Sequence, residues 1–321
     1  MSFWSQIPYV RLAYTYECQE ELLLPAFKGS ALRGAFGHAL KKVTCVQRRT
    51  ACDDCLLRAT CVYLYVFETP PPPDSRRLRL YPAAPHPFVI RPPRDQQEHF
   101  QPGEKLTGEL LLIGKAIEYL PYFVYALEIL GQTGLGRGRG RAELQEIQEL
   151  DHRGHPGRSL YTTAASLIST PDKIAWREVE AEMARASHQP VDLEVEFLTP
   201  VRLKSQGRLL EHLEYHHIIR NLLRRLASLA YFHGDQDPED FDFKQTIAAA
   251  VPVRSSGTRL HWQDWERYSA RQQTRMLMGG LLGTIRFSQV PPPGYSLLLT
   301  GEQLHVGKMA SFGLGQYVLK S

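Results

Sequence analysis

Apolar and polar residues alternate along several short segments of this chain, and such alternation predicts β-strands. The clearest case is YVRLAYTYEC at residues 9–18, where aromatic side chains recur at every second position near its end. Other strand-like runs lie at 62–68, 106–114, 141–150, 191–200, 281–290 and 316–320. Prolines 70–73 open a loop-rich stretch that extends to Pro93, because proline has no amide hydrogen to give to a strand or helix.

Helical spacing of apolar residues separates these runs. After Gly29 and Ser30, the apolar residues between Leu32 and Val43 fall on one arc of a helical wheel. Arg33, His38, Lys41 and Lys42 fall on the opposite arc. Further helices are predicted at 115–130, along the amphipathic stretch 219–230, and after a turn within 291–304.

Each half of the chain therefore repeats one order of strands and helices. Strand, helix, strands, helix and strand is the ferredoxin-like pattern. The sequence predicts an α+β protein with two tandem ferredoxin-like domains, at residues 1–188 and 189–321, and a cysteine-rich insertion at 45–61 in the first.

A glycine-rich loop precedes the last strand of each half. The first, GQTGLGRGRGR at 131–141, interleaves glycines with Arg137, Arg139 and Arg141. The second, at 305–315, carries three glycines beside Lys308. Glycine lets backbone N–H groups approach a phosphate, and arginine or lysine supplies the charge. A tight turn is the plainer interpretation of one such loop, but two in matching positions indicate a polyanion-binding surface.

Bulk composition sets only broad limits. At 321 residues with 43% apolar content, the chain can form two globular domains. The net charge of +4 is too small to argue for a nucleic-acid partner without the local clustering. No apolar run approaches the length of a membrane span and MSFWSQIPYV lacks signal-peptide features, so we expect a cytoplasmic protein with no membrane partner.

Four of the five cysteines form a compact motif. Cys45, Cys52, Cys55 and Cys61 have the spacing C-x6-C-x2-C-x5-C, and four thiolates can hold either one zinc ion or one iron–sulfur cluster. Structural zinc sites more often use two CxxC pairs, whereas this motif has one pair between two single cysteines. A structural 4Fe–4S cluster is therefore expected, with Zn²⁺ as the alternative. The motif also resembles the iron–sulfur loop of the endonuclease III family of DNA glycosylases, although no helix-hairpin-helix pattern accompanies it.

Several segments together resemble a known family. TPVRLKSQG, GGLLGTIRF and HVGKMASFGLGQYVL follow one another in the second half, and LRGAFGHAL and GLGRGRGR are looser counterparts in the first. They resemble the CRISPR-associated endoribonucleases of the RAMP superfamily that process precursor crRNA. The resemblance implies cleavage of CRISPR repeat RNA without a metal ion. In that reaction the 2′-hydroxyl attacks the adjacent phosphate and leaves a 2′,3′-cyclic phosphate and a 5′-hydroxyl.

The resemblance also implies which residues carry the reaction. Family members commonly place a catalytic histidine on the first helix, which matches His38, and Lys42 lies one turn beyond it. His305, beside Lys308 in the terminal loop, is the second candidate. Histidine suits a general base or acid near neutral pH.

Basic and glycine positions supply the predicted RNA contacts. These are Arg33, Lys41, Gly134, Gly136, Arg137, Arg139, Arg141, Lys204, Arg208, Gly307, Lys308, Gly313 and Gly315. Subunits of a CRISPR effector complex are further partners that the resemblance allows. The alternative functions are a RAMP subunit that binds crRNA without cutting it and, from the cysteine spacing alone, an iron–sulfur DNA repair enzyme.

Overall fold

The computed structural model describes residues 2–78, 83–186, 189–269 and 274–320, and the chain divides into two compact units. The N-terminal unit consists of Ile7–Arg177 and Phe232–Asp235. The C-terminal unit consists of Met1–Gln6, Glu178–Tyr231 and Gln236–Ser321. This division falls before the boundary predicted at residue 188.

The N-terminal unit is built on a five-stranded antiparallel sheet in the order β3-β5-β1-β6-β7. Its strands are β1 (Tyr9–Cys18), β2 (Leu22–Leu23), β3 (Phe88–Arg91), β4 (His99–Phe100), β5 (Lys105–Ile113), β6 (Ala142–Leu150) and β7 (Pro156–Thr162). Its helices are α1 (Gly29–Thr44) and α2 (Leu120–Thr133), and α3 (Ile174–Arg185) begins in it. Along the chain the four main strands follow one another as β1, β3, β5 and β6. In the sheet, β1 and β5 lie side by side at the centre, with β3 next to β5 and β6 next to β1, which is the ferredoxin-like arrangement.

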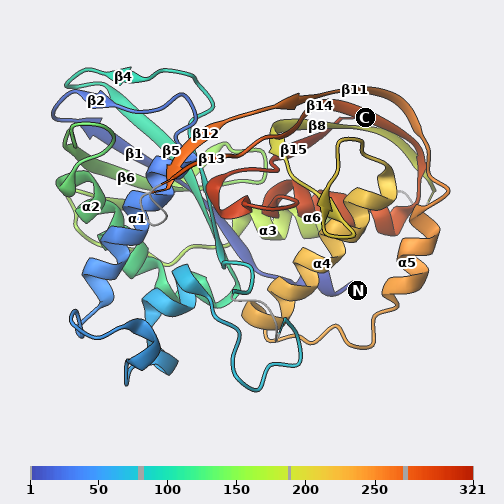
Figure 1. The fold of residues 1–321 in the computed structure, drawn as a ribbon, viewed down its shortest axis with the longest axis horizontal. Helices are drawn as coiled ribbons and strands as arrows, with labels where there is room; N and C mark the ends of the chain where they lie inside the picture. Colours follow the sequence, from blue (N-terminus) through green and yellow to red (C-terminus); the bar gives the residue numbers. More distant parts are fainter. Residues whose placement is uncertain (1, 79–82, 187–188, 270–273, 321) are drawn as a thin grey trace. The chain divides into compact units, whose positions relative to one another are not determined.

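Helices α1 and α2 pack together against this sheet (Figure 1). The core between them is aromatic. Phe36 of α1 stacks on Phe123 of α2 at 5.2 Å between ring centres and lies 5.5 Å from Phe88 of β3. On β1, Tyr14 and Tyr16 are buried and point into the same core, and the Tyr16 hydroxyl donates to the Leu127 carbonyl at 2.7 Å. Burial raises the pKa of both phenols, so these tyrosines are core residues.

The C-terminal unit repeats the plan in a four-stranded antiparallel sheet of order β11-β14-β8-β15. Its strands are β8 (Val191–Val201), β9 (Lys204–Ser205), β10 (Arg208–Leu209), β11 (Ser255–Gln263), β12 (Glu266–Ser269), β13 (Thr274–Leu277), β14 (Gly280–Val290) and β15 (Tyr317–Lys320). Its helices are α4 (Tyr215–His233), which ends in the N-terminal unit, α5 (Phe243–Ala250) and α6 (Pro292–Leu304). Both units thus confirm the predicted α+β class with tandem ferredoxin-like folds.

Helix α6 lies against both α4 and β15 in this unit (Figure 1). A Cβ at Gly301 would overlap Leu222 of α4 and the hydroxyl of Tyr317, so only glycine allows this close approach. The Tyr317 hydroxyl donates to the Leu298 carbonyl at 2.7 Å. The first residues of the chain pack here too, since the Trp4 indole donates to Ser296 Oγ at 3.0 Å.

The structure differs from the sequence predictions at two places near the cysteine motif. The run at 62–68, predicted as a strand, is helical, with a π-helix over Leu64–Glu68. Tyr63 and Phe67 stack across one turn at 5.5 Å between ring centres, and Thr69 ends the helix with a positive φ of 51°. The loop-rich stretch at 70–93 also contains β3. Within the described residues, none of the helices combines the length and apolar character needed to cross a membrane.

Candidate nucleic-acid interface and active site

His38 lies on the exposed face of α1, as the helical wheel predicts. Its neighbour Gly37 is on the buried face, where a Cβ would overlap the Phe67 ring. The close approach at Gly37 fixes the helix so that His38 points away from the core. Across the residues that the structure describes, the His38 ring makes no hydrogen bond or ion pair, which leaves both ring nitrogens available for proton transfer.

Lys41 and Lys42 follow His38 on the same exposed face. The Lys41 ammonium lies 5.4 Å from the centre of the Tyr63 ring, within the range of a cation–π contact. Lys42 has no partner among the described residues. Because residues four apart on a helix are neighbours, Lys42 is the free cation next to the His38 imidazole.

Arg33 has internal partners rather than a free guanidinium. Its charge lies 4.3 Å from the centre of the Phe67 ring, and its Nη2 donates to His86 Nε2 at 2.9 Å. Arginine can only donate, so His86 is a neutral acceptor at Nε2 and donates from Nδ1 to Thr69 Oγ1, also at 2.9 Å. The predicted role of Arg33 as an RNA contact therefore gains no support from its surroundings.

The first glycine-rich loop owes its glycines to close packing of its own backbone. Gly134 and Gly136 have φ values of 92° and 70°, which disfavour any residue with a Cβ. A Cβ at Gly134 would overlap the Arg139 carbonyl, and one at Gly136 would overlap the Leu23 carbonyl. These glycines shape the loop that presents the neighbouring arginines.

Two of the three arginines in this loop are free. Arg137 and Arg139 are exposed and have no side-chain partner in the described parts of the chain. Arg141 instead donates from Nε and Nη2 to Glu20 Oε1, at 2.9 and 2.7 Å. The side-chain hydrogen bond from Arg141 lowers the pKa of Glu20, so the pair stays ionised and Arg141 is neutralised. The predicted RNA contact of Arg141 therefore gains no support from this surface ion pair.

The terminal glycine-rich loop folds back on itself before β15. The Val306 N–H donates to the Gly315 carbonyl at 3.0 Å, and a Cβ at Gly315 would overlap the Val306 carbonyl. Gly307 and Gly313 have φ values of 88° and 89°. The Lys308 N–H donates to the Arg202 carbonyl at 2.9 Å, which ties the loop to the end of β8 and leaves the exposed Lys308 side chain at its tip.

Lys308 belongs to a cluster of like charges. Partial burial and then the charges of Arg224 and Lys204 lower the pKa of Lys308. Arg224 donates to Asn221 Oδ1 at 2.9 Å, and none of the three cations forms an ion pair with a carboxylate among the described residues. Cations held together without counter-ions favour binding of an anion. Arg208, exposed on the β9–β10 hairpin that also carries Lys204, adds a further positive charge that has no partner in the described ranges of the chain.

Arg224 is a member of this cluster that was not predicted from the sequence. The apolar periodicity of the sequence predicts that Arg224 lies on a helix, but its proximity to Lys308 depends on how the terminal loop folds back across the unit. A basic residue on the polar face of a helix near a predicted anion-binding loop is the signal that could have suggested it.

His305 is placed differently from its predicted catalytic role. Its side chain is buried, and Nδ1 donates to the Leu314 carbonyl at 3.0 Å. The backbone of His305, with φ 63° and ψ 163°, lies in a region that is essentially reserved for glycine. The ring is thus engaged within its own loop, and the predicted catalytic role of His305 gains no support from its surroundings.

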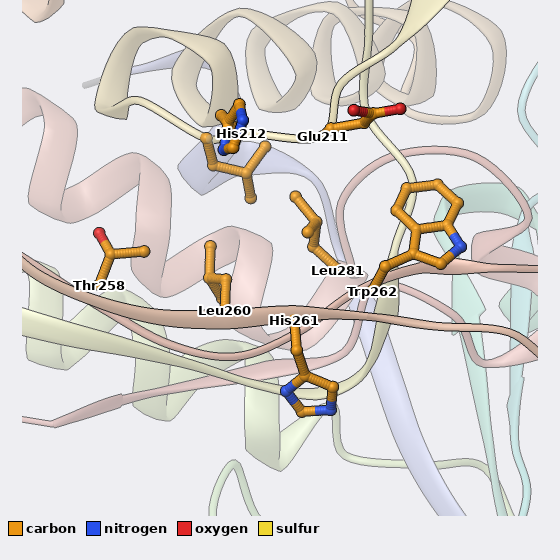
Figure 2. A pocket seen from close by; sticks show the side chains of 8 residues that line it. Glu211, His212, Thr258, Leu260, His261, Trp262 and Leu281 are labelled. Atoms are coloured by element: carbon orange, nitrogen blue, oxygen red, sulfur yellow. The ribbon is translucent and has the colours of Figure 1, made fainter.

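A pocket of about 570 Å³ opens on the C-terminal unit, between the loop before α4 and the strands β11 and β14 (Figure 2). Trp262 stands at its edge, 41% exposed, with its indole N–H donating to Asp264 Oδ1 at 2.9 Å. Figure 2 shows Leu260 and Trp262 on one side of β11 and His261 on the other. An exposed indole beside a pocket provides a surface on which a nucleobase can stack.

The start of α4 brings together three potential metal ligands, Glu214, His216 and His217, whose ligand atoms lie within 4.8 Å of one another. A capping role explains them as well. The backbone N–H of Glu214, just before the helix, donates to Nδ1 of His217, the third residue of the helix, at 3.2 Å. His216 Nδ1 lies 3.1 Å from Glu214 Oε2. These side chains therefore stabilise the helix end.

The cysteine motif lies directly after α1. All four of its cysteines are free and partly exposed, whereas the fifth cysteine, Cys18, is buried at the end of β1. No three of the four thiols lie within 4.8 Å of one another in this fully described segment.

Comparison with known proteins shows which protein families this chain matches. Residues 7–173, more than half of the 321, match the AF_1859_N family, described as an N-terminal domain. The chain belongs to the AF_1859_N family. Residues 195–317 match the family of the CRISPR-associated endoribonuclease Cas6. An uncharacterised protein of Archaeoglobus fulgidus is 29% identical over 306 residues, which cover 93% of each chain.

Solved structures share the fold of this AF_1859_N member. A partial Cas6-RT-Cas1–Cas2 complex aligns with a TM-score of 0.57 and 15% identity over 98% of this chain, which spans 46% of the length of that one. A Cas6 product complex aligns at 0.54 and 16% identity, and Thermus thermophilus Cas6 at 0.51 and 14%, each over 98% of this chain and 99% of the other. These structures show that the chain shares the fold of Cas6 proteins. They give no support to the resemblance of the cysteine motif to the endonuclease III loop.

Proposed function

We propose that this protein cleaves CRISPR repeat RNA to mature crRNA, by attack of a 2′-hydroxyl on the adjacent phosphate and without a metal ion. The observation that carries the proposal is the cluster of Lys204, Arg224 and Lys308, three cations without carboxylate partners among the described residues, gathered at the glycine-rich loop of the Cas6-matching segment. Such a cluster is suited to the RNA backbone, where phosphate contacts dominate affinity.

The reaction needs few catalytic groups. The 2′-oxygen loses its proton and bonds to phosphorus, the bond from phosphorus to the 5′-oxygen breaks, and that oxygen gains a proton. His38 is the proposed base or acid, because its ring is exposed and unpartnered within the described chain. Lys42, one turn further along α1, stabilises the charge that develops on the phosphate oxygens.

The proposed RNA path uses backbone and shape rather than base edges. In the N-terminal unit, Arg137 and Arg139 offer free guanidiniums on a loop with little side-chain bulk, and a guanidinium can hold a phosphate through two hydrogen bonds. In the C-terminal unit, Arg208 extends the cationic cluster and Trp262 offers a stacking surface. Lys41 contributes charge near His38 while its ammonium rests on Tyr63.

Protein partners follow from the relatives rather than from a surface of this chain. One fold relative is part of a complex of Cas6, RT, Cas1 and Cas2, and another is a Cas6 product complex. We infer that this protein works on crRNA within a CRISPR system and contacts other subunits of that system.

The test incubates the purified protein in EDTA with RNA that contains the CRISPR repeat of its own genome. Cleavage at one position, leaving a 2′,3′-cyclic phosphate and a 5′-hydroxyl, is expected, and a single 2′-deoxy substitution at the cut site should abolish it. Cleavage that persists in the 2′-deoxy RNA would overturn the mechanism. Tight binding without cleavage would instead identify a crRNA-binding RAMP subunit.

A further inference from the structure

The segment between Cys45 and Cys61 is held by little besides local turns. Its backbone hydrogen bonds span three residues, as from the Thr50 N–H to the Gln47 carbonyl at 3.1 Å and from the Arg58 N–H to the Cys55 carbonyl at 3.0 Å. Leu56 is 96% exposed, and no residue from 46 to 60 is fully buried. Ordering each residue costs about 1–2 kcal/mol of backbone entropy, and this segment buries too little apolar surface to offset that cost.

The cysteines occupy equivalent places in this chain of turns. Cys45 ends α1, Cys55 ends the 3-10 turn Cys52–Asp54, and Cys61 ends the 3-10 turn Arg58–Thr60. Their backbone angles are nearly identical, with φ/ψ of −87°/113°, −78°/128° and −74°/116°. Three thiols are therefore presented in the same way, each from the residue after a helical turn, and the fourth, Cys52, begins one of those turns.

The order of the cysteines along the chain favours one of the two metal centres that accept four cysteines. Structural zinc sites more often use two separated CxxC pairs. In this motif Cys52 and Cys55 form one such pair, and a single cysteine lies on either side of it. A cubane cluster carries one thiolate on each of four irons, and this motif supplies four thiols within one short segment.

We propose that Cys45, Cys52, Cys55 and Cys61 hold a 4Fe–4S cluster that braces the segment after α1. The bracing reaches the helix and the core directly. The Cys45 N–H donates to the Lys41 carbonyl at 2.9 Å, and Cys52 and Cys61 pack against the core of the N-terminal unit. The cluster thereby links the end of the helix that carries His38 to the unit beneath it, and its role is structural.

The test purifies the full chain under anoxic conditions and measures iron, acid-labile sulfide, zinc and visible absorption. About four irons and four sulfides per chain are expected, with broad visible absorption that dithionite bleaches. Zinc in a purified protein without iron would overturn the proposal, as would a protein without either metal. None of these measurements depends on RNA cleavage, so the result of this test is independent of the test of the proposed function.

Variants connect the cluster to these cysteines. Cys55→Ser should lose most of the iron and sulfide and lower the thermal midpoint of unfolding. Cys18→Ser is the matched control, because Cys18 is the fifth cysteine and is buried at the end of β1, and it should retain the full iron content. Iron that stays in the Cys55→Ser protein, or disappears from the Cys18→Ser protein while the fold persists, would contradict the ligand assignment.

Discussion

Replacement of Lys308 by alanine should make RNA binding less sensitive to salt. Arg224 and Lys204 each lie near enough to act on the charge of Lys308, and none of the three has a carboxylate partner among the described residues, so each is free to neutralise one phosphate. Each neutralised phosphate of a single strand contributes about 0.7 to the slope of log affinity against log salt, so the cluster contributes about 2.1. Removing Lys308 should make the slope shallower by about 0.7. Over a rise from about 50 to 200 mM salt, the variant should lose about 2.6-fold less affinity than the wild type.

The assay measures fluorescence anisotropy of a labelled repeat RNA with a 2′-deoxy substitution at the cut site, so that binding is seen without cleavage. Lys320→Ala is the matched control, since Lys320 lies in the same unit and its ammonium is 2.6 Å from Glu196 Oε2. The control should keep the wild-type slope because its charge is already neutralised. A Lys308→Ala slope equal to that of the wild type, or an equal change in Lys320→Ala, would refute the assignment of the cluster to RNA.

Three further substitutions test the packing. Glu109→Gln should destabilise the N-terminal unit by about 3–5 kcal/mol in denaturant unfolding, because it removes the carboxylate charge that lies within 3.2 Å of both Arg11 and Arg91. Burial opposes ionisation of Glu109, yet the two arginines lower its pKa overall. The stabilisation by the Glu109 carboxylate is therefore present above the unfolded pKa of about 4.3 and disappears as the pH falls through the lower folded pKa. Acid titration should show this loss of stability in the wild type but not in the Glu109→Gln variant. Gly34→Ala should raise stability by up to about 1 kcal/mol in the same measurement, since a Cβ there meets nothing within 4 Å inside α1. Gly315→Ala should weaken both the fold and RNA affinity, because its Cβ would overlap the Val306 carbonyl, and an unchanged melting temperature would contradict the close packing of the loop.

Periodicity alone was enough for most of the fold. The strand predicted at 9–18 has those same bounds in the structure, because its alternation matches burial on one face of the sheet. The exposure of His38 followed from the helical wheel in the same way. At 62–68 the same reasoning gave a strand where a helix forms, since a short run of apolar and aromatic residues fits either period and the stacking of Tyr63 on Phe67 decides between them.

The candidate site was harder to predict, because sequence reveals a charge but not its partner. Arg141 is neutralised by Glu20, and Arg33 rests on Phe67 beside His86, residues that only the folded chain brings near. His305 looked chemically suited to catalysis until its ring was seen to be buried against the Leu314 carbonyl. Charge type and spacing thus indicated the loops, while the choice of free side chains within them required the tertiary structure.

The most direct test of the proposed function compares single-turnover cleavage of repeat RNA, in EDTA, by wild type, His38→Ala and His99→Ala. His99 is an exposed histidine of the same unit and serves as the matched control. Loss of a general acid or base should slow the His38→Ala enzyme by about 10²–10⁴-fold without changing RNA affinity, whereas His99→Ala should cut at the wild-type rate. Equal rates for all three proteins would contradict the assignment of the chemistry to His38.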